Sequence, residues 1–323
     1  MEKNKVLFFL VIVVVILVFH SYSTTPKYNV ILISEDTLRA DHVGIYGNGN
    51  VTPNIDRLAK EGVYFENAIV NYDWTLPSHV SMLSSLYAST HGVLLVEQKI
   101  NDNVLTIQEI LKKKGYYTFA YTGDVFISKK YGFDQGFDFF DDYQGEYFSD
   151  FYDKLSVHLE QVKSKKFFLF IHSYDTHIDN LGAEKINHSQ LKLIEQTYDK
   201  KLSEYDSYIG NLYEKLEELE LLDNTLIIFT SDHGEEFLEH GKIGHGRTDP
   251  YEEIIKVPLI IRLPDKIKNK KIQAQVQSID IPPTILDILG YSIPTSFQGK
   301  SIMPLIEGKK ENLHDYIFIE TRG

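Results

Sequence analysis

The chain has 323 residues, of which 43% are hydrophobic and 13% aromatic, so it can bury one large core with at most a small appendage. Its formal net charge of −13 argues against a nucleic-acid backbone or an anionic membrane surface as a general partner. It contains no cysteine, which excludes disulfide bonds, thiolate metal sites and cysteine nucleophiles.

The N-terminus has the features of a targeting segment. Lys3 and Lys5 precede an uncharged apolar run over residues 6–19. This run is shorter than the roughly 20 residues that usually span a bilayer, and it suits the core of a signal peptide. No clear small-residue cleavage site follows it. We therefore expect residues 1–25 to be a hydrophobic helix, either a cleaved signal peptide or a signal anchor, with residues 26–323 exported or membrane-anchored and outside the cytoplasm.

The first predicted strand, Tyr28–Ser34, is a short apolar run that ends at the acidic residues Glu35 and Asp36. Such a run is typical of a buried parallel strand that presents carboxylates at its carboxyl end. Ligands of open α/β sheets gather at that end. A helix is predicted next over Ile55–Glu61, for which Pro53 suits the first helical position.

Helices and strands then alternate along the chain. In order, the apolar spacing predicts helices over Pro77–Leu86 and Thr106–Lys114, strands over Tyr117–Thr122 and Phe167–His172, a long helix over Leu191–Leu221, strands over Thr225–Thr230 and Val257–Leu263, and a helix over Ile281–Leu289. This alternation predicts an α/β fold with a largely parallel central sheet and helices on both faces. Loops are expected over 143–152 and 180–188 and at the basic run Lys266–Lys271.

Acidic and imidazole side chains recur at the ends of these strands. Asp175 and His177 follow one strand, and Asp232 and His233 follow the next. His245 lies in a glycine-rich loop shortly afterwards. Each pair alone would more often form a capped turn or an ion pair. Because the carboxyl ends of parallel strands meet at one edge of the sheet, their convergence predicts a metal site there.

Six segments occur in the order that is typical of sulfatases and their relatives in the alkaline phosphatase superfamily. They are I-S-E-D-T-L-R-A-D-H, T-P-N-I-D-R-L-A-K-E-G, W-T-L-P-S-H, S-D-H-G-E, G-H-G-R and V-P-L-I-I-R-L-P, between Asn29 and Thr284. The chain therefore resembles this superfamily, which implies an alkaline-phosphatase-like catalytic domain over residues 26–323. Relatives usually continue into a smaller C-terminal subdomain, so the domain is expected to be either naturally minimal or truncated.

The resemblance implies a set of metal ligands and a nucleophile. The implied ligands of one divalent ion are Glu35, Asp36, Asp232 and His233, and the nucleophile position is Thr75. Sulfatases have cysteine or serine there and convert it to formylglycine, so no formylglycine is expected in this chain. A threonine oxygen is better matched to phosphoryl transfer, because it can attack phosphorus and leave again with the help of a cation.

Other matched positions imply contacts with an ester. His79 replaces an arginine that supports the site in sulfatases, and it is predicted to bind substrate. Arg39 and Arg247 are predicted to bind ester oxygens, the alternative for Arg39 being an ion pair with Asp41 or Glu35.

His177 and His245 match substrate contacts of sulfatases and second-metal ligands of some phosphodiesterases. They are predicted to act as proton donor or oxyanion contact, and a second cation site would join them with Asp175. The aspartate and histidine ligands of the first site favour Zn²⁺ or Mn²⁺, with Ca²⁺ as the alternative.

Three functions are compatible with the sequence. The first is hydrolysis of a sulfate or phosphate ester in a glycan, lipid or small molecule, with phosphate favoured by the chemistry of Thr75. The second is transfer of a phosphoethanolamine- or phosphoglycerol-type group outside the membrane, where the N-terminal helix would anchor the enzyme. The third is noncatalytic binding by a sulfatase-like protein that lacks the usual nucleophile.

Overall fold

The computed structural model describes residues 28–123, 125–142, 147–178, 188–246, 249–264 and 269–321. The predicted signal peptide or signal-anchor helix over residues 1–25 lies outside these ranges. Within them, no helix combines the length and the apolar character that crossing a membrane requires.

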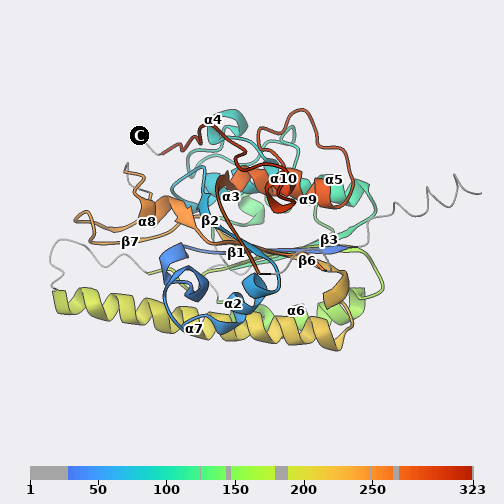
Figure 1. Cartoon of the computed structure of the whole chain (residues 1–323). Coiled ribbons are helices and arrows are strands. Elements are labelled where there is room, and N and C mark those ends of the chain that lie inside the picture. Colours follow the sequence, from blue (N-terminus) through green and yellow to red (C-terminus); the bar gives the residue numbers. More distant parts are fainter. Residues whose placement is uncertain are drawn as a thin grey trace, which may run out of the picture.

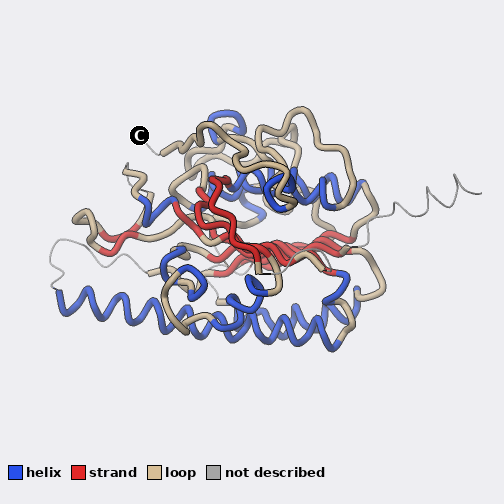
Figure 2. Tube along the Cα trace, in the orientation of Figure 1, coloured by secondary structure: helices blue, strands red, loops and turns tan. Residues whose placement is uncertain are grey.

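A mixed sheet of nine strands forms the centre of the molecule (Figures 1 and 2). Eight strands run in the order β11-β2-β10-β6-β1-β5-β3-β4, and β9 pairs with β2 outside this path. The strands are β1 (Asn29–Glu35), β2 (Val63–Ile69), β3 (Tyr117–Thr122), β4 (Phe139–Asp142), β5 (Phe167–Ser173), β6 (Thr225–Ser231), β9 (Lys256–Val257), β10 (Leu259–Arg262) and β11 (Lys270–Gln277). A separate two-stranded sheet joins β7 (Glu236–Phe237) to β8 (Ile243–Gly244).

The sheet is largely parallel, as the alternation of strands and helices predicts. β1 is parallel to both of its neighbours, with Ser34 beside His172 of β5 and beside Thr230 of β6. β9 and β10 are the exceptions, because they run antiparallel to their partners. They also divide the single predicted strand Val257–Leu263 at Pro258, since proline has no N–H to donate to a strand ladder.

Helices cover both faces of the sheet (Figure 1). One face carries α2 (Pro53–Lys60), α6 (Phe148–Val162) and α7 (His188–Glu218), and the other carries α3 (Thr75–Ser84), α5 (Ile107–Lys113), α9 (Ile281–Ile288) and α10 (Met303–Ile306). Shorter elements are α4 (Ala88–His91), α8 (Glu252–Ile255), η1 (Ala40–His42), η2 (Gly44–Tyr46), η3 (Lys129–Tyr131), η5 (Leu222–Asn224) and η6 (Ser278–Asp280). Successive side chains of β1 point to opposite faces of the sheet. Val30 and Leu32 pack on the face covered by α3, which we call the α3 layer, and Ile31 and Ile33 pack on the face covered by α7, the α7 layer.

Besides β7 and β8 of the small sheet, three strands of the central sheet go beyond the sequence-based prediction: β2, β4 and β11. These three strands lie at or next to the margins of the central sheet. Polar residues interrupt their apolar runs at positions that are only partly buried or exposed. The basic run Lys266–Lys271, predicted to be a loop, ends inside β11. There Nζ of Lys271 lies 2.7 Å from Oε1 of Glu66 on β2, so this end of the run is part of the sheet.

The predicted loop over 143–152 is also partly wrong, because α6 begins at Phe148. Its buried residues Phe148, Phe151, Leu155 and Leu159 recur at helical spacing. They pack in the α7 layer of the core, which makes this segment a structural helix from Phe148 onward.

His91, the last residue of α4, is a buried histidine outside the candidate site. Its Nδ1 accepts a hydrogen bond from the N–H of Val93, and its Nε2 donates to Oγ of Ser81, both at 3.1 Å. Burial lowers its pKa to about 4. The unfolded chain, with a histidine pKa near 6.5, therefore binds a proton that the folded protein does not, and stability is lost as the pH falls from 6.5 towards 4.

We expect His91 to account for about 2 kcal/mol of the loss in unfolding free energy between pH 7 and pH 5. Urea unfolding of the wild type and of His91→Gln at both pH values measures this. The variant should lose less stability than the wild type, whereas equal losses would show that His91 does not titrate in this way.

Candidate active site

Three buried side chains converge at the carboxyl ends of β1 and β6. Asp36 follows β1, and Asp232 and His233 follow β6, the neighbouring strand. Nε2 of His233 lies 3.6 Å from Oδ1 of Asp36 and 3.3 Å from Oδ2 of Asp232. One ligand atom from each residue lies within 4.8 Å of the others, and no second such group occurs in the described ranges. We call these three residues the Asp–Asp–His group.

The geometry of His233 fits a metal ligand. Its Nδ1 donates a hydrogen bond to the carbonyl oxygen of Gly234 at 2.9 Å, so Nε2 carries the lone pair that faces the two carboxylates. Burial and then the nearby ring of His245 lower the pKa of His233 well below its usual range, which keeps the imidazole neutral. Two carboxylates and one neutral imidazole form a donor set that suits a divalent cation.

Glu35 lies outside the Asp–Asp–His group, although it precedes Asp36. Glu35 is the last residue of β1. Its side chain lies on the same face of the sheet as that of Ile33, which packs in the α7 layer. Its carboxylate accepts hydrogen bonds from Oγ of Ser173 at 2.5 Å and from the N–H of Thr176 at 2.8 Å. The structure therefore places the predicted fourth ligand against the end of β5 and away from the other three.

Thr75 borders the Asp–Asp–His group from the α3 side. It is the first residue of α3, two residues before the predicted start of the helix, and its Oγ1 lies 3.3 Å from Nε2 of His233. Only 4% of Thr75 is exposed, so little of this residue faces solvent. The positive end of the helix dipole would also stabilise negative charge on this oxygen.

Two serines that the prediction did not include hold this arrangement together. Oγ of Ser78 donates to the carbonyl oxygen of Asp232 at 2.6 Å, which joins α3 to the loop after β6. Oγ of Ser231 donates to the carbonyl oxygen of His233, also at 2.6 Å. Both serines lie inside matched segments, W-T-L-P-S-H and S-D-H-G-E, and that position was the signal that could have identified them.

His79 lies in the core beneath the Asp–Asp–His group. Its Nδ1 donates to the carbonyl oxygen of Thr75 at 2.9 Å and lies 3.5 Å from Oδ2 of Asp232. Its Nε2 accepts a hydrogen bond from Oγ of Ser34 at 3.0 Å. Burial and then the ring of His172 lower the pKa of His79 well below its usual range. The structure thus places His79 to orient Thr75 and Asp232, which differs from the predicted contact with substrate.

His177, His245 and His233 form a row of rings, with His245 in the middle. The ring centroid of His245 is 4.2 Å from that of His233 and 5.4 Å from that of His177. Burial and then the proximity of His245 lower the pKa of His177 to about 3. His245 therefore lies directly beside the Asp–Asp–His group, and His177 lies one ring further away.

Asp175 does not join His177 and His245 in a group of metal ligands. Its Oδ2 accepts a hydrogen bond from the N–H of Phe148, at the start of α6, at 2.9 Å. Burial raises its pKa to about 6. Among the residues that the structure describes, the predicted second cation site is therefore not assembled.

Arg39 is already paired with carboxylates. Its Nε and Nη2 donate to the two oxygens of Asp41 at 3.0 and 2.8 Å, and its Nη1 lies 2.5 Å from Glu239. The same Nη1 donates to the carbonyl oxygen of Glu235 at 3.1 Å. Arg39 therefore forms the ion pair with Asp41 that was the alternative to binding ester oxygens. The other predicted ester-binding arginine, Arg247, lies outside the described residues.

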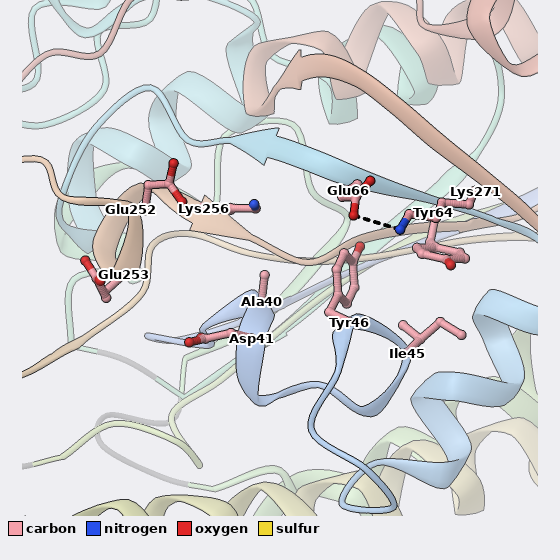
Figure 3. Close-up of a pocket in the computed structure, with 10 residues that line it drawn as sticks. All are labelled: Ala40, Asp41, Ile45, Tyr46, Tyr64, Glu66, Glu252, Glu253, Lys256 and Lys271. Carbon is pink, nitrogen blue, oxygen red and sulfur yellow. Dashed lines mark hydrogen bonds and ion pairs between the residues drawn. The ribbon is translucent and has the colours of Figure 1, made fainter.

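A cavity of about 210 Å³ lies apart from the Asp–Asp–His group (Figure 3). It is lined by residues of η1, η2, β2, α8, β9 and β11, and Figure 3 shows the ion pair between Glu66 and Lys271 beside it. Tyr46 in its wall exchanges two hydrogen bonds with the backbone of Leu259, at 3.2 and 3.0 Å. None of the residues predicted to carry chemistry lines this cavity.

The α/β sheet brings the Asp–Asp–His group and a threonine hydroxyl together at its carboxyl edge. The fold is of the alkaline-phosphatase-like class. The family model described as Sulfatase matches residues 28–291. The chain therefore belongs to the sulfatase family, and the resemblance stated from the sequence is confirmed.

Comparison with known proteins agrees with this assignment. An ulvan-active sulfatase of Formosa agariphila is 27% identical over 334 residues, covering 87% of this chain and 65% of that protein. The chain thus spans less than two thirds of that relative's length. Two solved structures share the fold. A phosphonate monoester hydrolase from Silicibacter pomeroyi has a TM-score of 0.77 at 19% identity, with 90% of this chain and 78% of that chain covered. A protein in complex with its substrate D-glucosamine-2-N,6-O-disulfate has a TM-score of 0.73 at 21% identity, with 91% and 82% covered.

Proposed function

We propose that the chain is a metal-dependent hydrolase of an anionic ester, with Thr75 as its nucleophile. The observation that carries this proposal is the position of Thr75 Oγ1, 3.3 Å from Nε2 of His233 at the border of the Asp–Asp–His group. Asp36, Asp232 and His233 would hold one divalent ion, with Zn²⁺ or Mn²⁺ favoured and Ca²⁺ as the alternative. When bound, the ion would supply the positive charge that activates a hydroxyl nucleophile and neutralises ester oxygens.

Thr75 would form and then lose a bond to the central atom of the ester. Its Oγ1 gives up a proton to solvent and attacks phosphorus, while the bond from phosphorus to the leaving alcohol breaks. Water then attacks phosphorus, the bond to Oγ1 breaks, and Oγ1 recovers a proton from solvent. Throughout, the hydrogen bond from His79 to the Thr75 carbonyl holds the start of α3 in place.

His177 and His245 would supply and recover the proton of the leaving group. In the structure the pKa of His177 is lowered to about 3, first by burial and then by His245. An anionic ester bound beside these rings would raise the pKa of His177, because an opposite charge favours the protonated form. A protonated imidazole can then give its proton to the leaving alcohol oxygen and take one back from the attacking water.

Thr75 favours phosphate esters over sulfate esters. A phosphorylated threonine can be released by attack of water at phosphorus, with the threonine oxygen as leaving group. A sulfated threonine would need slow attack of water at sulfur, and threonine cannot replace the cysteine or serine from which formylglycine is made. The second candidate is hydrolysis of a sulfated glycan. It is supported by the relative named as ulvan-active and by the fold neighbour whose substrate is a disulfated glucosamine.

An ester panel combined with metal exchange tests both candidates. The full chain is treated with a chelator, supplied singly with Zn²⁺, Mn²⁺, Mg²⁺ or Ca²⁺, and assayed with an aryl phosphate, an aryl phosphodiester and an aryl sulfate. We expect chelation to lower turnover by at least about 10³-fold, because the ion provides several kcal/mol of charge stabilisation. One ion should restore turnover, with a higher kcat/KM for a phosphorus ester.

Faster cleavage of the aryl sulfate or of a sulfated disaccharide would establish the second candidate instead. A folded protein that binds metal but cleaves none of these esters would contradict both.

A further inference from the structure

The turn that follows β1 has an unfavourable backbone conformation at Thr37. This residue, directly after Asp36, is fully buried and has a φ angle of +56°. Residues with a branched β-carbon are rarely found in this left-handed region, because the side chain crowds the backbone. Such a conformation costs of order 1–3 kcal/mol and persists only where surrounding contacts hold it.

Two of the holding contacts come from the end of β6 and the loop that follows it. The N–H of Thr37 donates to Oδ1 of Asp232 at 3.3 Å, and the N–H of Leu38 donates to Oγ of Ser231 at 3.0 Å. The turn and the loop therefore orient each other. Each of them carries a member of the Asp–Asp–His group, so the shape of the turn affects the relative placement of Asp36 and Asp232.

The backbone of Asp36 is held by the end of β5, since its N–H donates to the carbonyl oxygen of Ser173 at 3.0 Å and its carbonyl oxygen accepts from Oγ1 of Thr176 at 2.5 Å. The residues after Asp36 are held by Tyr198, a residue of α7 that is distant in sequence. Its hydroxyl donates to the carbonyl oxygen of Thr37 at 2.8 Å and accepts a hydrogen bond from the N–H of Arg39 at 2.9 Å. One hydroxyl therefore closes the turn from both ends. Tyr198 is fully buried, and its ring packs edge-on against His42 and Phe237, with centroids 4.9 and 5.1 Å away.

We propose that Tyr198 is a positioning residue for the metal ligands and acts through the turn at Thr37. The inference rests on the proposed role of Asp36, Asp232 and His233 in binding a divalent ion. Without the Tyr198 hydroxyl, the turn would lose the group that satisfies one backbone carbonyl and one N–H in a buried place. The strained turn could then relax, and Asp36 would lose the direction in which the turn holds it.

Tyr198→Phe removes only the hydroxyl, and Tyr205→Phe is a matched control. Tyr205 lies about two turns further along α7, is also fully buried, and makes no hydrogen bond to the turn Thr37–Arg39. Isothermal titration of the metal-free full-length proteins with Zn²⁺ and with Mn²⁺ measures the dissociation constant directly, without relying on activity.

We expect Tyr198→Phe to weaken metal binding by about 10- to 100-fold, the usual effect of losing a group that orients a metal ligand. Tyr205→Phe should bind metal as the wild type does. Turnover of Tyr198→Phe should fall at limiting metal and recover at saturating metal. The far-UV circular dichroism of the metal-free variant should match that of the wild type, which excludes a general loss of folding as the cause.

Equal metal affinity in Tyr198→Phe and the wild type would overturn this inference while leaving the proposed function in place. Absence of metal binding in the wild type would instead overturn the proposed function. If Tyr198→Phe does not fold, the double variant with Thr37→Gly is titrated, because glycine adopts a φ of this sign without strain. Its reference is Thr37→Gly alone, from which it differs only in the hydroxyl of residue 198. Equal metal affinities of this single variant and the double variant would equally overturn the proposed role of the hydroxyl.

Discussion

Thr75→Ala should lower kcat/KM by at least about 10⁴-fold, because the variant lacks the oxygen that forms the bond to phosphorus. The metal site should survive, since its proposed ligands are Asp36, Asp232 and His233. Alanine also favours the helical conformation, so the first turn of α3 should remain intact. Steady-state kinetics at saturating metal, together with metal titration of the same protein, separates the loss of the nucleophile from a loss of the ion.

Thr75→Ser is the matched control, because it keeps the hydroxyl and removes one methyl group. We expect this variant to retain most of the wild-type kcat. Acid quenching during turnover of a phosphate ester should trap a phosphorylated peptide that contains Thr75 in the wild type and no such peptide in Thr75→Ala. Full activity of Thr75→Ala would refute the covalent mechanism.

Asp36→Asn should weaken metal binding by about 10²- to 10³-fold. The exchange preserves the shape of the side chain but removes one negative charge from a buried site, and breaking a buried charge interaction costs about 3–5 kcal/mol. Turnover at limiting metal should fall by a similar factor. Titration with Zn²⁺ and Mn²⁺ and thermal unfolding with and without metal check this, because an ion that binds only the folded state raises its melting temperature.

Asp206→Asn provides the comparison for Asp36→Asn. Asp206 of α7 is also buried, but its carboxylate accepts hydrogen bonds from the backbone N–H groups of Asn54 and Ile55 at the start of α2. Its replacement should lower the unfolding free energy by about 1 kcal/mol through loss of the cap and leave metal affinity unchanged. Wild-type metal affinity in Asp36→Asn would remove Asp36 from the proposed ligand set.

The central strands were predictable because each is buried on both faces. The sequences of four central strands, β1, β3, β5 and β6, are nearly continuous apolar runs. The ends of each strand in the structure differ from the predicted ends by at most one residue. Strands near the margins were harder to recognise. In β11, for example, exposed lysine and glutamine residues alternate with buried ones, so its sequence resembles a solvated loop.

The convergence of Asp36, Asp232 and His233 also followed from sequence, because adjacent parallel strands bring their carboxyl ends to the same edge. The same reasoning could not separate Glu35 from Asp36. The two are neighbours in sequence, but Glu35 still belongs to the pleat of β1 and meets the end of β5, whereas Asp36 lies beyond the strand.

The sequence by itself determined the class of fold, the family and the edge of the sheet at which a site would form. These depend on local patterns: apolar runs, strand-end residues and the order of matched segments. Only the tertiary structure decided the partners of individual side chains, such as Arg39 with Asp41, Asp175 with the start of α6, and Tyr198 with the turn at Thr37. The physical reason is that these partners are chosen by helix packing and by the direction of each side chain from the backbone. Neither helix packing nor side-chain direction produces a periodic pattern in the sequence from which these partners could be predicted.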